Sequence, residues 1–155
     1  MTYRKATASD LNVLIQLRLD YLAEDRGVLS ETEKSAVAAQ LGEYFPKHIG
    51  NDFFAFLAEA GGDIAAVAFL VIAEMPANPS FITGKTGTVM NVLTYPQYRR
   101  QGIAMQLLEC LIEEAKTWGL SYVKLSATEA GRPLYEKLGF EVQQSHYTEM
   151  KLHLL

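Results

Sequence analysis

Apolar residues recur along this chain with two kinds of spacing, one typical of helices and one typical of strands. Over residues 11–25 and 103–118 they recur every three or four positions, which puts them on one face of a helix. Residues 53–59, 64–74 and 86–94 form apolar runs without that spacing, and turn residues bound them. The pattern therefore predicts two amphipathic helices with a group of strands between them.

Further signals mark where helices begin and end. Residues 7–10 offer capping side chains immediately before the first helix. The run Ser30-Glu31-Thr32-Glu33 is a capping box, which predicts a second helix that reaches about Tyr44. Pro46 and Gly50 are expected to end that helical region.

The remaining elements are shorter. Strands are predicted at residues 3–6 and 122–126, and a short helix at residues 133–138. Two closing strands are predicted at residues 140–143 and 147–154. In the last of these, apolar and polar side chains alternate, as they do on the two faces of a strand.

The order of these elements indicates the fold class. Strand 86–94, helix 103–118 and strand 122–126 form a βαβ crossover, whose two strands should run parallel. The two strands before it are joined by the turn Gly61-Gly62-Asp63 and form a hairpin. We therefore predict an α/β fold, with a central mixed, mostly antiparallel sheet and helices on both faces, as a single domain over residues 1–155.

Composition limits the function more than the fold. With 49% hydrophobic and 21% charged residues, the chain has the composition of a globular domain. Its net charge of −4 argues against a general nucleic-acid binder, which would be basic. Cys110 is the single cysteine, so no intrachain disulfide can form and a cytoplasmic location is expected. The longest apolar run, residues 64–73, is too short to span a bilayer and no apolar signal core stands at the start, so we expect no membrane partner.

The loop after the strand at 86–94 has the chemistry of an anion site. Free N–H groups in the first turn of the following helix carry partial positive charge, and the helix dipole adds to it. Arg99 and Arg100 contribute full charges beside that turn, and Gly102 lets a ligand approach the backbone closely. The expected ligand carries a phosphate or pyrophosphate.

Two motifs in this order of elements resemble those of the GNAT superfamily of acetyl-CoA-dependent N-acetyltransferases. The cofactor-loop pattern Gln/Arg-x-x-Gly-x-Gly/Ala of that family stands here as Arg99-Arg100-Gln101-Gly102-Ile103-Ala104. A second pattern, Leu-Tyr-x-x-x-Gly-Phe, stands as Leu134-Tyr135-Glu136-Lys137-Leu138-Gly139-Phe140. The resemblance covers essentially the whole chain. It implies the GNAT fold and transfer of the acetyl group of acetyl-CoA to a primary amine.

The resemblance also implies where acetyl-CoA would bind. The main-chain amides of residues 100–105 would hold the pyrophosphate, and the pantetheine arm would pair with residues 92–94, where that strand separates from the next. We expect a β-bulge within residues 91–94. The implied cofactor-binding residues are Val92, Leu93, Thr94, Arg99, Arg100, Gln101, Gly102, Ile103, Ala104 and Met105.

Catalytic side chains are implied in the same way. Tyr135 matches the tyrosine that protonates the departing CoA thiolate in many relatives, although a packed structural aromatic is the alternative. Some relatives hold the cofactor arm with an asparagine seven residues earlier, a position that is Thr128 here. No motif assigns the general base, for which Glu74, Glu129 and Glu59 are candidates.

Three functions remain compatible with these residues. The first is the N-acetyltransferase, the second a catalytically inactive CoA-binding sensor or partner-binding module, and the third transfer of a longer acyl group. The acceptor, a small-molecule or peptide amine, cannot be read from the sequence. His48, His146 and His153 lack metal-ligand spacing, so we expect no metal. The apolar C-terminal strand would either pair across a homodimer or close the sheet.

Overall fold

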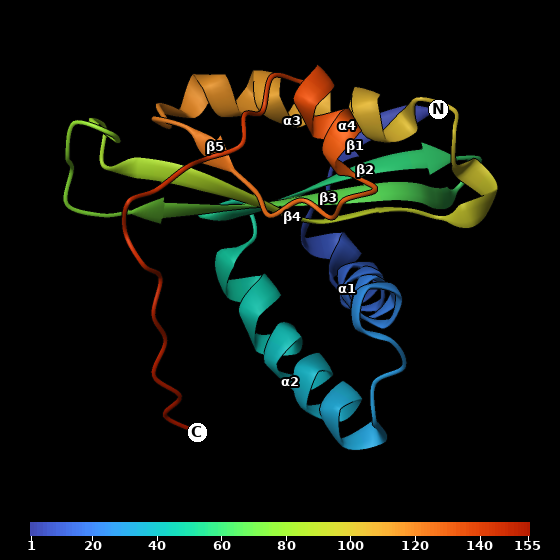
Figure 1. Cartoon of the computed structure of the whole chain (residues 1–155). Coiled ribbons are helices and arrows are strands. Elements are labelled where there is room, and N and C mark those ends of the chain that lie inside the picture. Colours follow the sequence, from blue (N-terminus) through green and yellow to red (C-terminus); the bar gives the residue numbers. More distant parts are fainter.

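The structure is a computed structural model that describes residues 1–155 and contains one five-stranded sheet with strand order β1-β2-β3-β4-β5 (Figure 1). The strands from β1 to β4 pair antiparallel, whereas β4 and β5 pair parallel. The strands are β1 (Thr2–Lys5), β2 (Phe53–Ala60), β3 (Asp63–Glu74), β4 (Lys85–Thr94) and β5 (Val123–Lys124). This mixed, mostly antiparallel sheet confirms the predicted fold class.

Helices cover both faces of the sheet, with α1 and α2 on one face and α3 and α4 on the other (Figure 1). The helices are α1 (Leu11–Arg26), α2 (Glu31–His48), α3 (Ile103–Ala115) and α4 (Arg132–Lys137). Three single 3-10 turns are present. Ala8–Asp10 precedes α1, Pro96–Tyr98 lies within the loop between β4 and α3, and Lys116–Trp118 follows α3. The predicted third helix therefore tightens over its last three residues instead of remaining an α-helix to Trp118.

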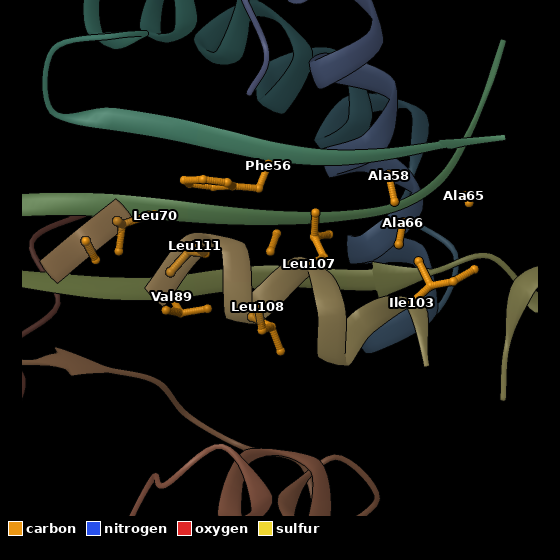
Figure 2. Packing of buried hydrophobic residues seen from close by; sticks show 12 residues of the cluster. Phe56, Ala58, Ala65, Ala66, Leu70, Val89, Ile103, Leu107, Leu108 and Leu111 are labelled. Atoms are coloured by element: carbon orange, nitrogen blue, oxygen red, sulfur yellow. The ribbon is translucent and has the colours of Figure 1, made fainter. Parts of the chain in front are cut away.

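Two buried clusters, one on each face, fix the layers. Alternate residues of β2 and β3 point to opposite faces, so Leu57 and Val67 join the α1–α2 cluster while Ala58 and Ala68 join the α3 cluster. Figure 2 shows the α3 cluster, in which leucines of the helix lie over small alanines of the strands. Both faces of β3 are buried, as its unbroken apolar run predicts.

The capping box at Ser30 forms as predicted. The Ser30 hydroxyl accepts from the N–H of Glu33 at 3.1 Å, and the Glu33 carboxylate accepts from the N–H of Ser30 at 3.0 Å. The prediction that the helix ends near Tyr44 is wrong, because α2 continues through Pro46 to His48. The fully buried Phe45 and the stacking of Tyr44 on His48, with centroids 4.3 Å apart, hold this last turn although Pro46 donates no hydrogen bond.

The C-terminal part of the sheet differs from the prediction. The strand predicted at 122–126 is shorter, because β5 comprises Val123–Lys124 alone. The closing strands predicted at 140–143 and 147–154 do not form, and the C-terminal segment runs away from the sheet (Figure 1). Met150, Leu152 and Leu154 are 82–90% exposed. Alternation of side chains makes a segment suitable for a strand, but its backbone hydrogen bonds must come from a neighbouring strand, and none pairs with it here.

Candidate active site

The loop between β4 and α3 opens onto a hollow. Gly102 ends this loop with φ of 73°, in the left-handed region that favours glycine, and Arg100 has φ of 61°. Apart from the adjoining backbone, a Cβ atom built on Gly102 would have no atom within 4 Å. The space above this residue is therefore open to a ligand.

Free backbone donors line the same place. The first hydrogen bond of α3 runs from the N–H of Gln106 to the carbonyl of Gly102 at 3.1 Å, so the N–H groups of residues 103–105 have no acceptor within the helix. The positive end of the helix dipole adds to their field. The hollow has a volume of about 200 Å³ and is lined by Thr94, Tyr98, Arg99, Arg100, Gly102, Ile103, Ala104, Met105 and Leu134.

The two arginines of the loop have different surroundings. Arg99 forms an ion pair with Glu24 of α1, and its Nε donates to the carbonyl of Thr94 at 2.9 Å. Arg100 forms no ion pair and is exposed, so its charge remains available to a ligand. Gln101 lies outside the lining of the hollow, and its side chain donates to the carbonyl of Gln97 at 3.4 Å.

A β-bulge interrupts β4, as predicted. Residue pairing with β3 shifts between Val67 and Phe69, so Asn91 and Val92 together stand opposite one residue, Ala68. Asn91 carries the irregularity: its φ is 55°, and it is only 1% exposed.

The bulge is tied to α1 by side-chain hydrogen bonds. Arg18 Nη1 donates to Asn91 Oδ1 at 3.2 Å, and Asn91 Nδ2 donates to the carbonyl of Leu17 at 3.5 Å. A buried asparagine can adopt a left-handed conformation at low cost, and these contacts satisfy its amide group.

Beyond the bulge, β4 has no neighbour on the β5 side. The two strands pair only at Gly87 with Val123 and at Thr88 with Lys124. The backbone of residues 92–94 therefore has no partner in β5. The side chain of Leu93 is buried on the α1–α2 face, so only its backbone faces the gap, while Val92 packs towards α3.

Tyr135 lies on α4, one residue after Leu134 of the hollow. Its ring packs against Gly131, where an added Cβ would come within 3.2 Å of Tyr135 Cε2. Burial, with a smaller contribution from Tyr21, raises the pKa of Tyr135 above its ordinary value. The phenol therefore keeps its proton at neutral pH and can act as a donor. It also forms part of the wall of a larger cavity of about 880 Å³ beside β5.

None of the candidate bases stands at the bulge. Glu59 is paired with Arg4 at 2.7 Å, and Glu74 lies at the far end of β3, opposite Lys85. Glu129 is on the exposed turn before α4. The β4 strand itself carries no carboxylate.

Thr128 stands at the position where some relatives place an asparagine. Its hydroxyl already accepts a hydrogen bond from the turn in which it lies. It accepts from the N–H of Gly131 at 3.1 Å, immediately before α4.

Sequence reasoning missed the contribution of α1. Asp20 accepts from the Tyr95 hydroxyl at 2.5 Å, which joins α1 to the end of β4, and burial followed by this hydrogen bond raises the pKa of Tyr95. Arg18 approaches the bulge from the same helix. The sequence did carry one signal for Arg18. It lies four residues from both Leu14 and Leu22, so a charged side chain interrupts the apolar face of the helix.

The structure contains neither a cluster of metal ligands nor a membrane-spanning helix. The structure brings no three potential metal-ligating side chains together. None of its helices has the length and apolar character that crossing a membrane requires.

The open helix start, the bulged fourth strand and the parallel βαβ unit are the features of an acyl-CoA-binding acetyltransferase, and the sequence comparison agrees. Residues 16–140 match the Acetyltransferase (GNAT) family, and the chain belongs to that family.

The comparisons also identify similar individual proteins. A predicted acetyltransferase from Clostridium acetobutylicum, whose crystal structure contains acetyl-CoA, is 29% identical, with a TM-score of 0.83 over 97% of this chain and 95% of that one. A GCN5-related N-acetyltransferase from Ralstonia eutropha JMP134 shares the fold, with 24% identity and a TM-score of 0.80 over 96% and 97% of the two chains.

A curated relative is similar over a shorter stretch. Glucosamine 6-phosphate N-acetyltransferase from Trypanosoma brucei brucei is 33% identical over 84 residues. The match spans 53% of this chain and 55% of the relative.

The residues present fit acetyl-CoA, the cosubstrate of this family. The hollow offers unpaired N–H groups, one unpaired arginine and open space above Gly102, which together suit a pyrophosphate. Residues 92–94 have no partner on the β5 side, and this open strand edge suits the amides of an extended arm.

Proposed function

We propose that this chain is a single-domain, cytoplasmic N-acetyltransferase that moves the acetyl group of acetyl-CoA to a primary amine by direct attack in a ternary complex. The observation that carries the proposal is the open start of α3, where the N–H groups of residues 103–105 have no acceptor within the helix. Beside it, the bulged end of β4 has no partner on the β5 side.

When bound, acetyl-CoA supplies an activated acetyl thioester. In the proposed mechanism, the N–H groups of residues 100–105 and the guanidinium of Arg100 bind the pyrophosphate, and the backbone of residues 92–94 orients the arm. Arg99 shapes the loop through Glu24 and Thr94.

Two hydrogen-bond donors, one at the bulge and one on α4, would lower the barrier to acetyl transfer. A main-chain N–H at the bulge stabilises the negative charge that develops on the carbonyl oxygen as the neutral amine attacks. The Tyr135 hydroxyl, which burial keeps protonated, donates its proton to the departing CoA sulfur. As the C–N bond forms and the C–S bond breaks, the amine nitrogen loses a proton to water and Tyr135 regains one from solvent, so the products are an amide and CoA. Holding amine and thioester together provides much of the acceleration.

One observation favours a second candidate function. Because no carboxylate stands on β4 and Glu59 is already paired, a CoA-binding sensor without catalysis also fits the site. The two candidates predict the same CoA binding and differ only in turnover.

The acceptor and the assembly state are further parts of the proposal. The relative from Trypanosoma brucei brucei is named for glucosamine 6-phosphate, which makes phosphorylated amino sugars the first small-molecule acceptors to test, followed by peptide amines. The exposed apolar residues of the C-terminal segment suit pairing in a homodimer. A monomeric mass by light scattering would contradict the homodimer.

Calorimetric titration with acetyl-CoA and CoA, followed by a thiol-release assay over a panel of amines, tests the proposal. Binding with release of thiol on one class of amine supports the transferase. Binding without release on any amine supports the sensor. Loss of all binding would refute the assignment of the α3 start as the CoA site. Replacing acetyl-CoA by longer acyl-CoA in the same assay tests the third function.

A further inference from the structure

Arg18 is a half-buried cation without an anionic partner. Arg4, Arg99 and Arg132 each contact a carboxylate, but Arg18 contacts none, although the protein has a net charge of −4. Its guanidinium donates to the neutral Asn91 Oδ1 at 3.2 Å, which uses one of five N–H donors. Burial lowers the pKa of Arg18, yet a guanidinium stays charged at neutral pH.

The surroundings of Arg18 put this charge beside the proposed reaction site. Its guanidinium lies 5.9 Å from the centre of the Tyr21 ring, and its hydrogen-bond acceptor is the bulge residue itself. Tyr21 in turn lies close enough to Tyr135 to affect its pKa. Arg18 therefore lies where α1 meets β4, in contact with the bulge.

We propose that Arg18 binds an anionic group, a carboxylate or a phosphate, on the amine acceptor. The inference rests on the proposed transferase function and narrows its substrate class to amines that carry such a group. A planar guanidinium with free parallel donors binds both anions through paired, charge-assisted hydrogen bonds. A protein of net negative charge otherwise repels such an acceptor, so a positive charge held at the site by Asn91 and Tyr21 gives selectivity.

The test is calorimetric binding of matched amines to the full chain, with and without CoA. Each pair differs only in the anion: glucosamine 6-phosphate against glucosamine, O-phosphoethanolamine against ethanolamine, and phenylalanine against phenethylamine. The first two pairs report on phosphate and the third on carboxylate. We expect at least one anionic member to bind more tightly than its neutral counterpart.

Three variants distinguish the effect of the Arg18 charge from a general disturbance of the fold. Arg18→Gln should weaken binding of the anionic member at least tenfold and leave the neutral member unchanged. Asn91→Asp should have the same effect with Arg18 retained, because it supplies a competing carboxylate at the position of Oδ1. Lys34→Gln, which removes an exposed positive charge on α2, is the matched control and should change neither. Melting temperatures identify any variant that does not fold.

Three results would overturn the proposal: no anionic member preferred by the wild-type chain, equal weakening of both members by Arg18→Gln, or an equal loss of anion binding in Lys34→Gln. Failure of the proposed transferase function gives a different result. In that case acetyl-CoA does not bind or no thiol is released, while the chain still binds the anionic amine more tightly than its neutral counterpart.

Discussion

Replacing Asn91 by glycine and by alanine separates the two roles of this residue in the bulge. Both changes remove the hydrogen bonds to Arg18 and to the Leu17 carbonyl. Because Arg18 is half-buried and can regain water, this loss should cost about 1–2 kcal/mol.

The two variants differ in the backbone. Glycine adopts φ near 55° without strain, whereas alanine in the left-handed region costs about 1–2 kcal/mol. The larger freedom of unfolded glycine offsets about 0.5–1 kcal/mol of that difference. We therefore expect Asn91→Gly to destabilise by about 1–2 kcal/mol and Asn91→Ala by about 1.5–3 kcal/mol, that is, about 0.5–1 kcal/mol more than Asn91→Gly.

Urea and thermal unfolding measure this order. In a chain of this length 1 kcal/mol corresponds to about 2–4 °C in Tm, so the two variants should be resolved. Thr88 is the matched control, since it lies in the regular part of β4, where the order should reverse and glycine should be the worse substitution. Equal or greater stability of Asn91→Ala than of Asn91→Gly would refute a positive φ at this residue.

Three further predictions concern the loop, the proposed acid and the N-terminal ion pair. Gly102→Glu should abolish CoA binding in calorimetry because it puts a carboxylate into the anion site, whereas Gly119→Glu, with a similar φ of 70° in the turn after α3, should retain it. Tyr135→Phe should lower kcat by about 10² with little change in the affinity for acetyl-CoA, and an unaltered rate would make this residue structural. The Arg4 guanidinium lowers the pKa of Asp10 to about 2, so the stability it provides is present above the ordinary value near 4 and is lost as pH falls towards 2. In urea unfolding from pH 6 to pH 2, Asp10→Asn should lose less stability on acidification than the wild type.

Much of the fold could be predicted because its signals are local. The capping box at Ser30 and Glu33 is made by residues three positions apart, and it forms as expected. The unbroken apolar run of β3 requires cover on both faces, which α1–α2 and α3 provide. The glycine in the loop and the free first turn of α3 likewise follow from a short stretch of sequence.

Where the expectation failed, the outcome depended on partners outside the segment. The helix continues through Pro46 because Phe45 is buried in the core, which no local propensity reveals. Residues 147–154 alternate as a strand should, yet form none, because no strand edge pairs with them.

The candidate site divides in the same way. The sequence alone determined that the start of α3 has the chemistry of an anion site and that Tyr135 follows in a second motif. Only the tertiary structure decided that Arg99 is taken up by Glu24, 75 positions away, and that Arg18 reaches Asn91 across 73 positions. Such pairs form because α1 packs across β4, and the geometry of that packing, rather than any pattern along the chain, determines which charges are neutralised and which remain free to bind a ligand.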